Sequence, residues 1–231
     1  MAMKTIRNHP GRLDRKSRVM QRIFDSAHKL PLIPSSDRYN ITISHQKRFL
    51  WFRVAKVGTT TIFHQLQESG VDLDVERASN VYYSKKIFKD YFKFAFVRNP
   101  WERLVSCWQD KVVKKNMYRF EPAELIKMRD FRNFVDFVEQ LDIEKCDRHI
   151  CLQSALIDLS EIDYLGRMEA FEKDLIEIFG ILDVPLEDVK KKNKSSYENP
   201  FRELYTQELI ERVAAIYRKD IQIFGYHFNA I

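Results

Sequence analysis

The chain has 231 residues, 45% of them hydrophobic, and a formal net charge of +6. Such a length and composition fit one globular domain with a sizeable core, and they exclude a disordered or fibrous chain. No apolar run approaches the ~20 residues that a membrane-spanning helix needs, and no apolar segment of the secretory type follows the first charge at Lys4.

The excess charge is concentrated in residues 1–22, which hold seven of the 39 Lys and Arg residues and one of the 33 acidic residues. The rest of the chain is neutral overall, which argues against a nucleic-acid-binding face on its body. Apolar residues recur at helical spacing up to Leu30, so we expect a basic helical arm and linker at 1–36 and a domain at 37–231. A basic amphipathic helix can lie on an anionic membrane; the alternative is that it docks on the domain.

The first polar turn follows a predicted strand at 47–54 and precedes a predicted helix at 59–69. It offers a lysine, a glycine and three hydroxyls from the residues Lys56, Gly58, Thr59, Thr60 and Thr61. The unpaired N–H groups and the positive dipole end of a helix start suit an oxyanion. A strand, turn and helix of this kind are also compatible with a simple helix cap.

The second polar turn follows a predicted strand at 91–97, and Pro100 then begins a predicted helix at 100–116. Arg98 at the strand end can make a forked contact to a phosphate, and Ser106 lies off the apolar stripe of the helix. Alternatively, Arg98 binds a carboxylate and Ser106 is solvated. Together the two turns can hold two separate phosphate-like groups, which suggests a nucleotide that carries a second phosphate.

The remaining pattern alternates strands and helices. We predict a short strand near 71–76, a strand at 161–166, and helices at 122–140, 146–157, 170–180, 186–192 and 203–218. Strands separated by helices predict an α/β fold, a three-layer parallel sheet flanked by helices. Ligands then bind at the carboxyl ends of the strands, where both turns fall.

The two turns resemble the sulfotransferase superfamily, through K-x-G-T-T at 56–60 and R-x-P-x-x-R-x-x-S at 98–106. The closer similarity is to the carbohydrate O-sulfotransferases of the heparan-sulfate and chondroitin type and their bacterial relatives. Three later segments are similar to family motifs: D-x-H-x-x-x-Q at 147–153, G-R-x-E at 166–169 and Y-x-x-D-x-x-x-F-G-Y at 217–226.

This resemblance implies in-line transfer of a sulfuryl group from 3′-phosphoadenosine 5′-phosphosulfate (PAPS) to a hydroxyl or an amine, with PAP as product and no metal; of the two we expect a hydroxyl. A P-loop-like loop would bind the 5′-phosphosulfate, and its residues are Lys56, Val57, Gly58, Thr59, Thr60 and Thr61. Lys56 would also be catalytic, because it would stabilise charge on the oxygen that leaves sulfur. Arg98 and Ser106 would hold the 3′-phosphate. A late loop closes over the donor in relatives, which makes Lys194, Ser195 and Tyr197 candidate contacts; a solvated charge run is the alternative.

The general base is less determined, because family members use His or Glu and residues 68–90 contain no His. Glu76 resembles the Glu base of the glucosaminyl and tyrosyl-protein branches, and Asp74 is a close competitor. His149 and His64 are the histidine alternatives. An ion pair with Arg77 or a solvated turn would give Glu76 a structural role only.

The three cysteines have no disulfide-framework spacing and favour a reducing compartment. We therefore expect a soluble, bacterial, cytoplasmic enzyme; the alternative is a luminal domain of a Golgi-type enzyme without its anchor. The acceptor would be a glycan, a glycolipid or a related small molecule. A nucleotide-dependent phosphotransferase is the rival enzyme, but the chain lacks G-x-x-x-x-G-K-[ST]. A basic nucleic-acid-binding protein is the rival that is not an enzyme.

Overall fold

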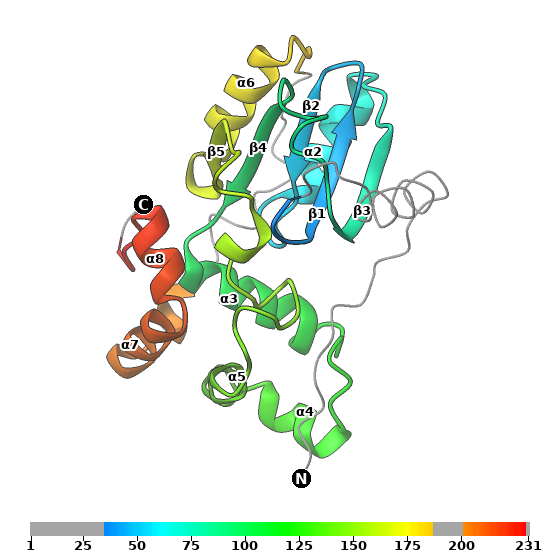
Figure 1. Cartoon of the computed structure of the whole chain (residues 1–231). Helices are drawn as coiled ribbons and strands as arrows, with labels where there is room; N and C mark the ends of the chain where they lie inside the picture. The colour runs from blue at the N-terminus through cyan, green and yellow to red at the C-terminus, as the bar shows by residue number, and fades with distance from the viewer. Residues whose placement is uncertain (1–34, 187–200, 230–231) are drawn as a thin grey trace. The chain divides into compact units, whose positions relative to one another are not determined.

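The computed structural model describes residues 35–186 and 201–229 (Figure 1). Within them the chain forms two compact units. Residues 35–97 and 154–186 make up the first, called here the sheet unit; residues 98–153 and 201–229 make up the second, the helical unit. The predicted N-terminal helix and the predicted helix at 186–192 lie, wholly or nearly so, outside the described residues.

The sheet unit holds five strands in the order β3-β1-β2-β4-β5. Their bounds are β1 Tyr39–Ser44, β2 Phe49–Phe52, β3 Val75–Val81, β4 Phe92–Val97 and β5 Tyr164–Arg167. Strands β2, β4 and β5 run parallel, whereas β1 runs antiparallel to both β2 and β3. The α/β class is confirmed, but the sheet is mixed rather than parallel, because the short turn at 45–48 permits only an antiparallel hairpin.

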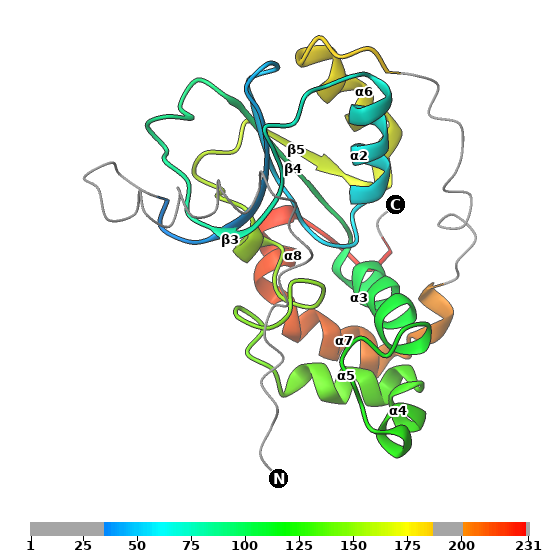
Figure 2. The same cartoon turned by 90° about the vertical axis from the view of Figure 1, so that its right-hand side faces the viewer.

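Two helices, α2 (Thr59–Glu68) and α6 (Phe171–Ile181), lie on one face of this sheet (Figure 2). Trp51 contacts Phe63 of α2 at 5.0 Å between ring centroids, and Trp51 also stacks on Phe94. On the opposite face, Phe52 of β2 contacts Tyr83 in the segment after β3. Residues 94–97 of β4 are fully buried, so this central strand is covered on both faces.

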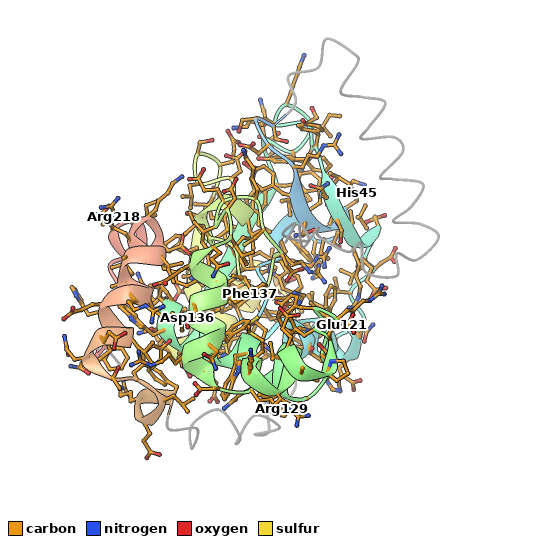
Figure 3. All side chains as sticks on the ribbon, turned by 90° about the horizontal axis from the view of Figure 1, so that it is seen from below. His45, Glu121, Arg129, Asp136, Phe137 and Arg218 are labelled. Atoms are coloured by element: carbon orange, nitrogen blue, oxygen red, sulfur yellow. The ribbon has the colours of Figure 1, made fainter. Side chains whose placement is uncertain are left out.

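The helical unit contains α3 (Pro100–Trp108), α4 (Pro122–Met128), α5 (Phe131–Glu139), α7 (Gln207–Ile216) and α8 (Arg218–Phe224). A π-helical turn, Gln109–Val113, continues α3. Asp136 lies on the side of α5 next to α7 (Figure 3), where Arg212 binds it together with Glu139. These ion pairs join the two helices along their exposed sides.

Several predicted helices differ from the observed ones. The helix predicted at 122–140 breaks at Asp130, whose carboxylate accepts a hydrogen bond from the N–H of Arg132 at 2.8 Å and so starts α5. The helix predicted at 146–157 is wrong: that segment forms turns and a 3₁₀ turn, Ser154–Leu156. The helix predicted at 203–218 divides into a 3₁₀ turn, Phe201–Leu204, and α7, which Thr206 caps.

Candidate functional site

The first turn has an unusual backbone for residues other than glycine. Lys56 and Gly58 both have left-handed φ values, 72° and 77°, and the buried side chain of Val57 lies between them. Helix α2 starts directly afterwards, and no described side chain caps its first turn. The N–H of Thr61 donates to the carbonyl of Gly58 at 2.9 Å. The N–H groups that precede it at the helix start are the ones that suit an anion. Thr59 departs from the predicted pattern, because its hydroxyl donates to the carbonyl of Val54 at 3.0 Å.

The first turn packs against an aromatic side chain of α6, which contacts another on β4. A Cβ atom at Gly58 would lie 2.6 Å from Cε2 of Phe171, the first residue of α6. The ring of Phe171 contacts Phe96 of β4 at 5.2 Å between centroids. A Cβ atom at Gly166 would in turn lie 2.5 Å from the ring of Phe96. We call these four residues the aromatic stack; it explains the glycine of the G-R-x-E segment by packing alone.

The second turn begins at Arg98, which directly follows the last residue of β4. Asn99 caps α3 by accepting from the N–H of Trp101 at 3.1 Å, and the predicted helical start at Pro100 is confirmed. The guanidinium of Arg98 donates to Oε1 of Glu102 at 2.6 Å. Glu102 and Ser106 are one helical turn apart and both are partly exposed. The fold therefore brings Arg98 to the face of α3 that carries Ser106.

Three candidate bases belong to the sheet unit, and each has a close neighbour. The carboxylate of Glu76, on the edge strand β3, accepts from Nε of Arg77 at 3.0 Å. Asp74 accepts from the backbone N–H of His45 at 2.6 Å. His64 is half-exposed on α2, 3.8 Å from Glu68. Glu76 is thus in the ion pair with Arg77 that the sequence offers as its structural alternative. Asp74 binds the backbone of His45, directly after β1.

The fourth candidate, His149, belongs to the helical unit and is nearly buried. Its Nδ1 lies 2.7 Å from Oδ1 of Asp147, which also accepts from the backbone N–H of His149 at 3.0 Å. Burial lowers the pKa of His149, although Asp147 opposes that shift. Burial alone would raise the pKa of Asp147, but the hydrogen bonds from His149 bring it below its ordinary value. A neutral ring that donates from Nδ1 leaves Nε2 able to accept a proton.

The late candidate contacts and the cysteines complete the set of predicted residues. Lys194, Ser195 and Tyr197 lie outside the described residues. The cysteines Cys107, Cys146 and Cys151 are buried as free thiols. Burial raises the pKa of Cys151 to about 12. Across 35–186 and 201–229 there is no cluster of three or more metal-ligating side chains and no helix able to cross a bilayer.

Comparison with known proteins places the chain in a family. The model of the Sulfotransferase family matches residues 39–227. Carbohydrate sulfotransferase 10 of Xenopus laevis is 28% identical over 80% of this chain and 67% of the relative. Carbohydrate sulfotransferase 10 of Gallus gallus is 31% identical over 62% of this chain and 48% of the relative. Carbohydrate sulfotransferase 14 of Danio rerio is 24% identical over 81% of this chain and 62% of the relative. The chain thus spans about half to two thirds of these relatives, and no solved structure matches it.

These matches confirm the predicted resemblance, the fold class and the enzyme class, a PAPS-dependent sulfuryl transferase. They do not support the cytoplasmic expectation: the relatives are carbohydrate sulfotransferases, the type for which the resemblance implies a Golgi anchor, and they are compatible with the luminal alternative. Because the family model covers most of the described residues, from β1 to the segment after α8, the chain belongs to the sulfotransferase family.

Proposed function

We propose that this protein transfers a sulfuryl group from PAPS to a hydroxyl of a glycan or glycolipid. The relatives are named for carbohydrate acceptors, which supports this acceptor class. A nucleotide-dependent phosphotransferase is a weaker alternative, because the chain lacks the Walker pattern. A basic nucleic-acid-binding protein is weaker still, because the excess charge lies in residues 1–22.

The observation that carries the proposal is the relation of β2 to β4. The two strands are parallel neighbours, with Phe52 opposite Ala95, so their carboxyl ends leave the same edge of the sheet. Each strand is followed by a polar turn and a helix. This edge of an open α/β sheet is where ligands bind.

Lys56 and the start of α2 would bind the 5′-phosphosulfate. During transfer the bond from sulfur to the bridging phosphate oxygen breaks, and a bond from the acceptor oxygen to sulfur forms. Lys56 would stabilise the negative charge that develops on that bridging oxygen, together with the N–H groups of Gly58, Thr59 and Thr60. The N–H of Thr61 donates to the carbonyl of Gly58 at 2.9 Å, so Thr61 would contribute through its hydroxyl. Donors set in place by the left-handed turn need no rearrangement as this charge forms.

Arg98 and Ser106 would hold the 3′-phosphate, which is remote from sulfur and therefore serves to position the donor. The Arg98 side chain is largely buried, so its charge is poorly screened by water. Glu102 shares the same guanidinium, and a phosphate would compete with this carboxylate for it. The residues Lys194, Ser195 and Tyr197 stay candidate contacts to the donor.

The acceptor hydroxyl must lose its proton to a base. Glu76 is one proposed acceptor of this proton, and it would have to separate from Arg77 to take the role. His149 is the other, and the structure of its pair with Asp147 resembles the arrangement in which a carboxylate orients a catalytic imidazole. The basic arm at 1–22 is proposed either to dock on the domain or to contact an anionic membrane.

The proposal is tested with purified protein, calorimetry with PAP, and transfer of ³⁵S from labelled PAPS to a panel of glycans and glycolipids. We expect PAP to bind and label to appear in a carbohydrate acceptor without added metal. Absence of heat with PAP and of labelled product, or magnesium-dependent turnover of ATP instead, would contradict the proposal. Cosedimentation with anionic vesicles at varied salt separates the two proposals for the arm.

A further inference from the structure

A buried glutamine holds the backbone of Arg98. Oε1 of Gln153 accepts from the backbone N–H of Arg98 at 2.9 Å, and Nε2 of Gln153 donates to the backbone carbonyl of Arg98 at 2.9 Å. The Gln153 side chain is fully buried. A primary amide that binds both groups of one residue reproduces the pairing that a neighbouring strand would supply.

This pairing occurs where the sheet can no longer supply a partner. The last residue of β4, Val97, is paired with Arg167 at the end of β5. Arg98 is the next residue, so its backbone groups need other partners once they are buried. Gln153 provides both of them.

Gln153 is itself fixed from α8. Its backbone N–H donates to Oδ2 of Asp220 at 2.7 Å, and Asp220 is fully buried. The hydroxyl of Tyr217, next to the start of α8, donates to the carbonyl of Ile150 at 2.7 Å. Two residues of the Y-x-x-D segment therefore hold the stretch that ends at Gln153.

The same stretch is also fixed from α3. The guanidinium of Arg103 donates to the carbonyl of Cys151 at 2.8 Å and to the carbonyl of Arg148 at 2.8 Å. Residues 148–153 are thus bound by two helices of the helical unit. We call these contacts of Arg103, Gln153, Tyr217 and Asp220 the polar clasp.

A buried carboxylate, guanidinium and amide are unfavourable in a core unless they are hydrogen-bonded. Apolar side chains of similar size would give as much cohesion without that requirement. The polar clasp is directional: its hydrogen bonds fix the position of the backbone at Arg98 more narrowly than apolar contacts would. A forked contact to phosphate needs such placement, to within about 0.5 Å.

We infer that Gln153 is a positioning residue for the nucleotide site: by pairing with the backbone of Arg98, it sets the guanidinium for the 3′-phosphate of the donor. The inference rests on the proposed role of Arg98. It gives a function to the glutamine of the D-x-H-x-x-x-Q segment and to the tyrosine and aspartate of the Y-x-x-D segment, which would act on the donor nucleotide through Arg98.

The test compares the affinities of two nucleotides, PAP and adenosine 5′-phosphate, which lacks the 3′-phosphate. Gln153→Leu keeps the volume of the side chain and removes both hydrogen bonds. We expect it to weaken the binding of PAP by about tenfold, as the loss of two hydrogen bonds would. The affinity for adenosine 5′-phosphate should be nearly unchanged. The matched control is Gln65→Leu, at a buried glutamine of α2 whose Oε1 accepts no hydrogen bond from any described residue. It should leave the ratio of affinities as in the wild type.

Two further measurements keep the test decisive if Gln153→Leu unfolds. Gln153→Glu keeps an acceptor for the Arg98 N–H and loses the donor, so it should reduce the preference for PAP by a smaller factor. Hydrogen exchange at the Arg98 amide should accelerate in Gln153→Leu or, where that variant does not fold, in Gln153→Ala at low temperature, and not in Gln65→Leu.

The possible outcomes separate the role of Gln153 from the role of Arg98. A folded Gln153→Leu that keeps the wild-type preference for PAP, or that weakens both nucleotides equally, would overturn the inference and leave the proposed function standing. A wild-type protein that binds both nucleotides equally would remove the 3′-phosphate role of Arg98, and the inference with it.

Discussion

The two polar turns follow neighbouring parallel strands, yet they are held by different forces. The turn at Gly58 rests on the aromatic stack, in which size decides the fit. The turn at Arg98 is held by the polar clasp, in which hydrogen-bonding groups decide the fit. The comparison shows that one fold can position two polar turns in different ways, one by apolar packing and the other by buried hydrogen bonds.

This difference has a practical consequence. Added volume should disturb the first turn strongly, because overfilling a packed core strains its neighbours. Replacing a polar side chain by an apolar one of equal volume should disturb the second turn, because it leaves buried hydrogen-bonding groups without partners.

Lys56→Ala should lower transfer by at least ~10²–10³-fold, the loss expected when one donor to a developing charge is removed. The fold should be unchanged, since residue 56 lies in a turn. Initial rates with labelled PAPS and the thermal unfolding midpoint check this. Lys173→Ala, at an exposed position of α6, is the matched control. Turnover near that of the wild type would remove Lys56 from its role.

Glu76→Gln and His149→Gln decide which unit supplies the base. The variant that removes the base should lower the rate by about 10²-fold or more with little change in donor affinity. A wild-type rate in Glu76→Gln would assign the base to a histidine. Single-turnover rates and PAP affinities, measured side by side, separate the two effects.

The pH dependence gives a second criterion for the same choice. A base works only when deprotonated, so kcat/KM falls as pH drops below its pKa. Because burial lowers the pKa of His149, a rate that depends on His149 should hold to below pH 6.5, the ordinary value, and then fall. Folding stability should follow the same sign: protonation of His149 in the unfolded chain destabilises the fold as pH drops below 6.5. His149→Gln should flatten this part of the stability profile.

Gly58→Ala should weaken PAPS binding by about tenfold or more and destabilise the fold by about 2–5 kcal/mol. The left-handed φ contributes ~1–2 kcal/mol and the overlap with Phe171 adds ~1–3 kcal/mol. Gly180→Ala is the control, because a Cβ atom there meets nothing within 4 Å and lies in α6, so it should stabilise slightly. Adding Phe171→Leu to Gly58→Ala should recover part of the loss, whereas no recovery would argue against the aromatic stack.

Arg98→Ala should weaken the binding of PAP by about ten- to a hundredfold, the effect of a lost charged hydrogen bond. It should weaken the binding of adenosine 5′-phosphate much less. Arg132→Ala removes an exposed arginine that pairs with Glu208, and it should change neither affinity by more than about twofold. Calorimetry with both nucleotides measures the difference. Equal losses for the two nucleotides would take the 3′-phosphate away from Arg98.

Features coded by neighbouring residues could be predicted from the sequence. The starts of α2 and α3 depend on local signals, the Gly58 turn and Pro100 after Asn99, and both were predicted at the residues where they occur. Strand β1 was missed, although Ile41 and Ile43 alternate with polar residues, because six residues are a weak signal without their partners β2 and β3.

Features that depend on distant contacts could not be predicted in this way. Gln153 meets Arg98 across 55 positions of the chain, and no local pattern encodes that pairing. The segment around His149 was predicted as a helix, but Asp147 binds the N–H of His149 and forms a turn instead. The packing of Phe171 against Gly58 could not be predicted, because an aromatic residue at a helix start is common and the contact joins distant parts of the chain.

The contact of Gly166 with Phe96 limits which substitutions this chain can accept at position 166. Gly166 has no left-handed backbone, so its lack of a side chain reflects the neighbouring ring alone. An alanine at 166 becomes tolerable only after the ring at 96 has been replaced by something smaller. Related chains should therefore show the two positions varying together, small beside large, and reconstructed ancestors should acquire the smaller residue at 96 before any side chain at 166.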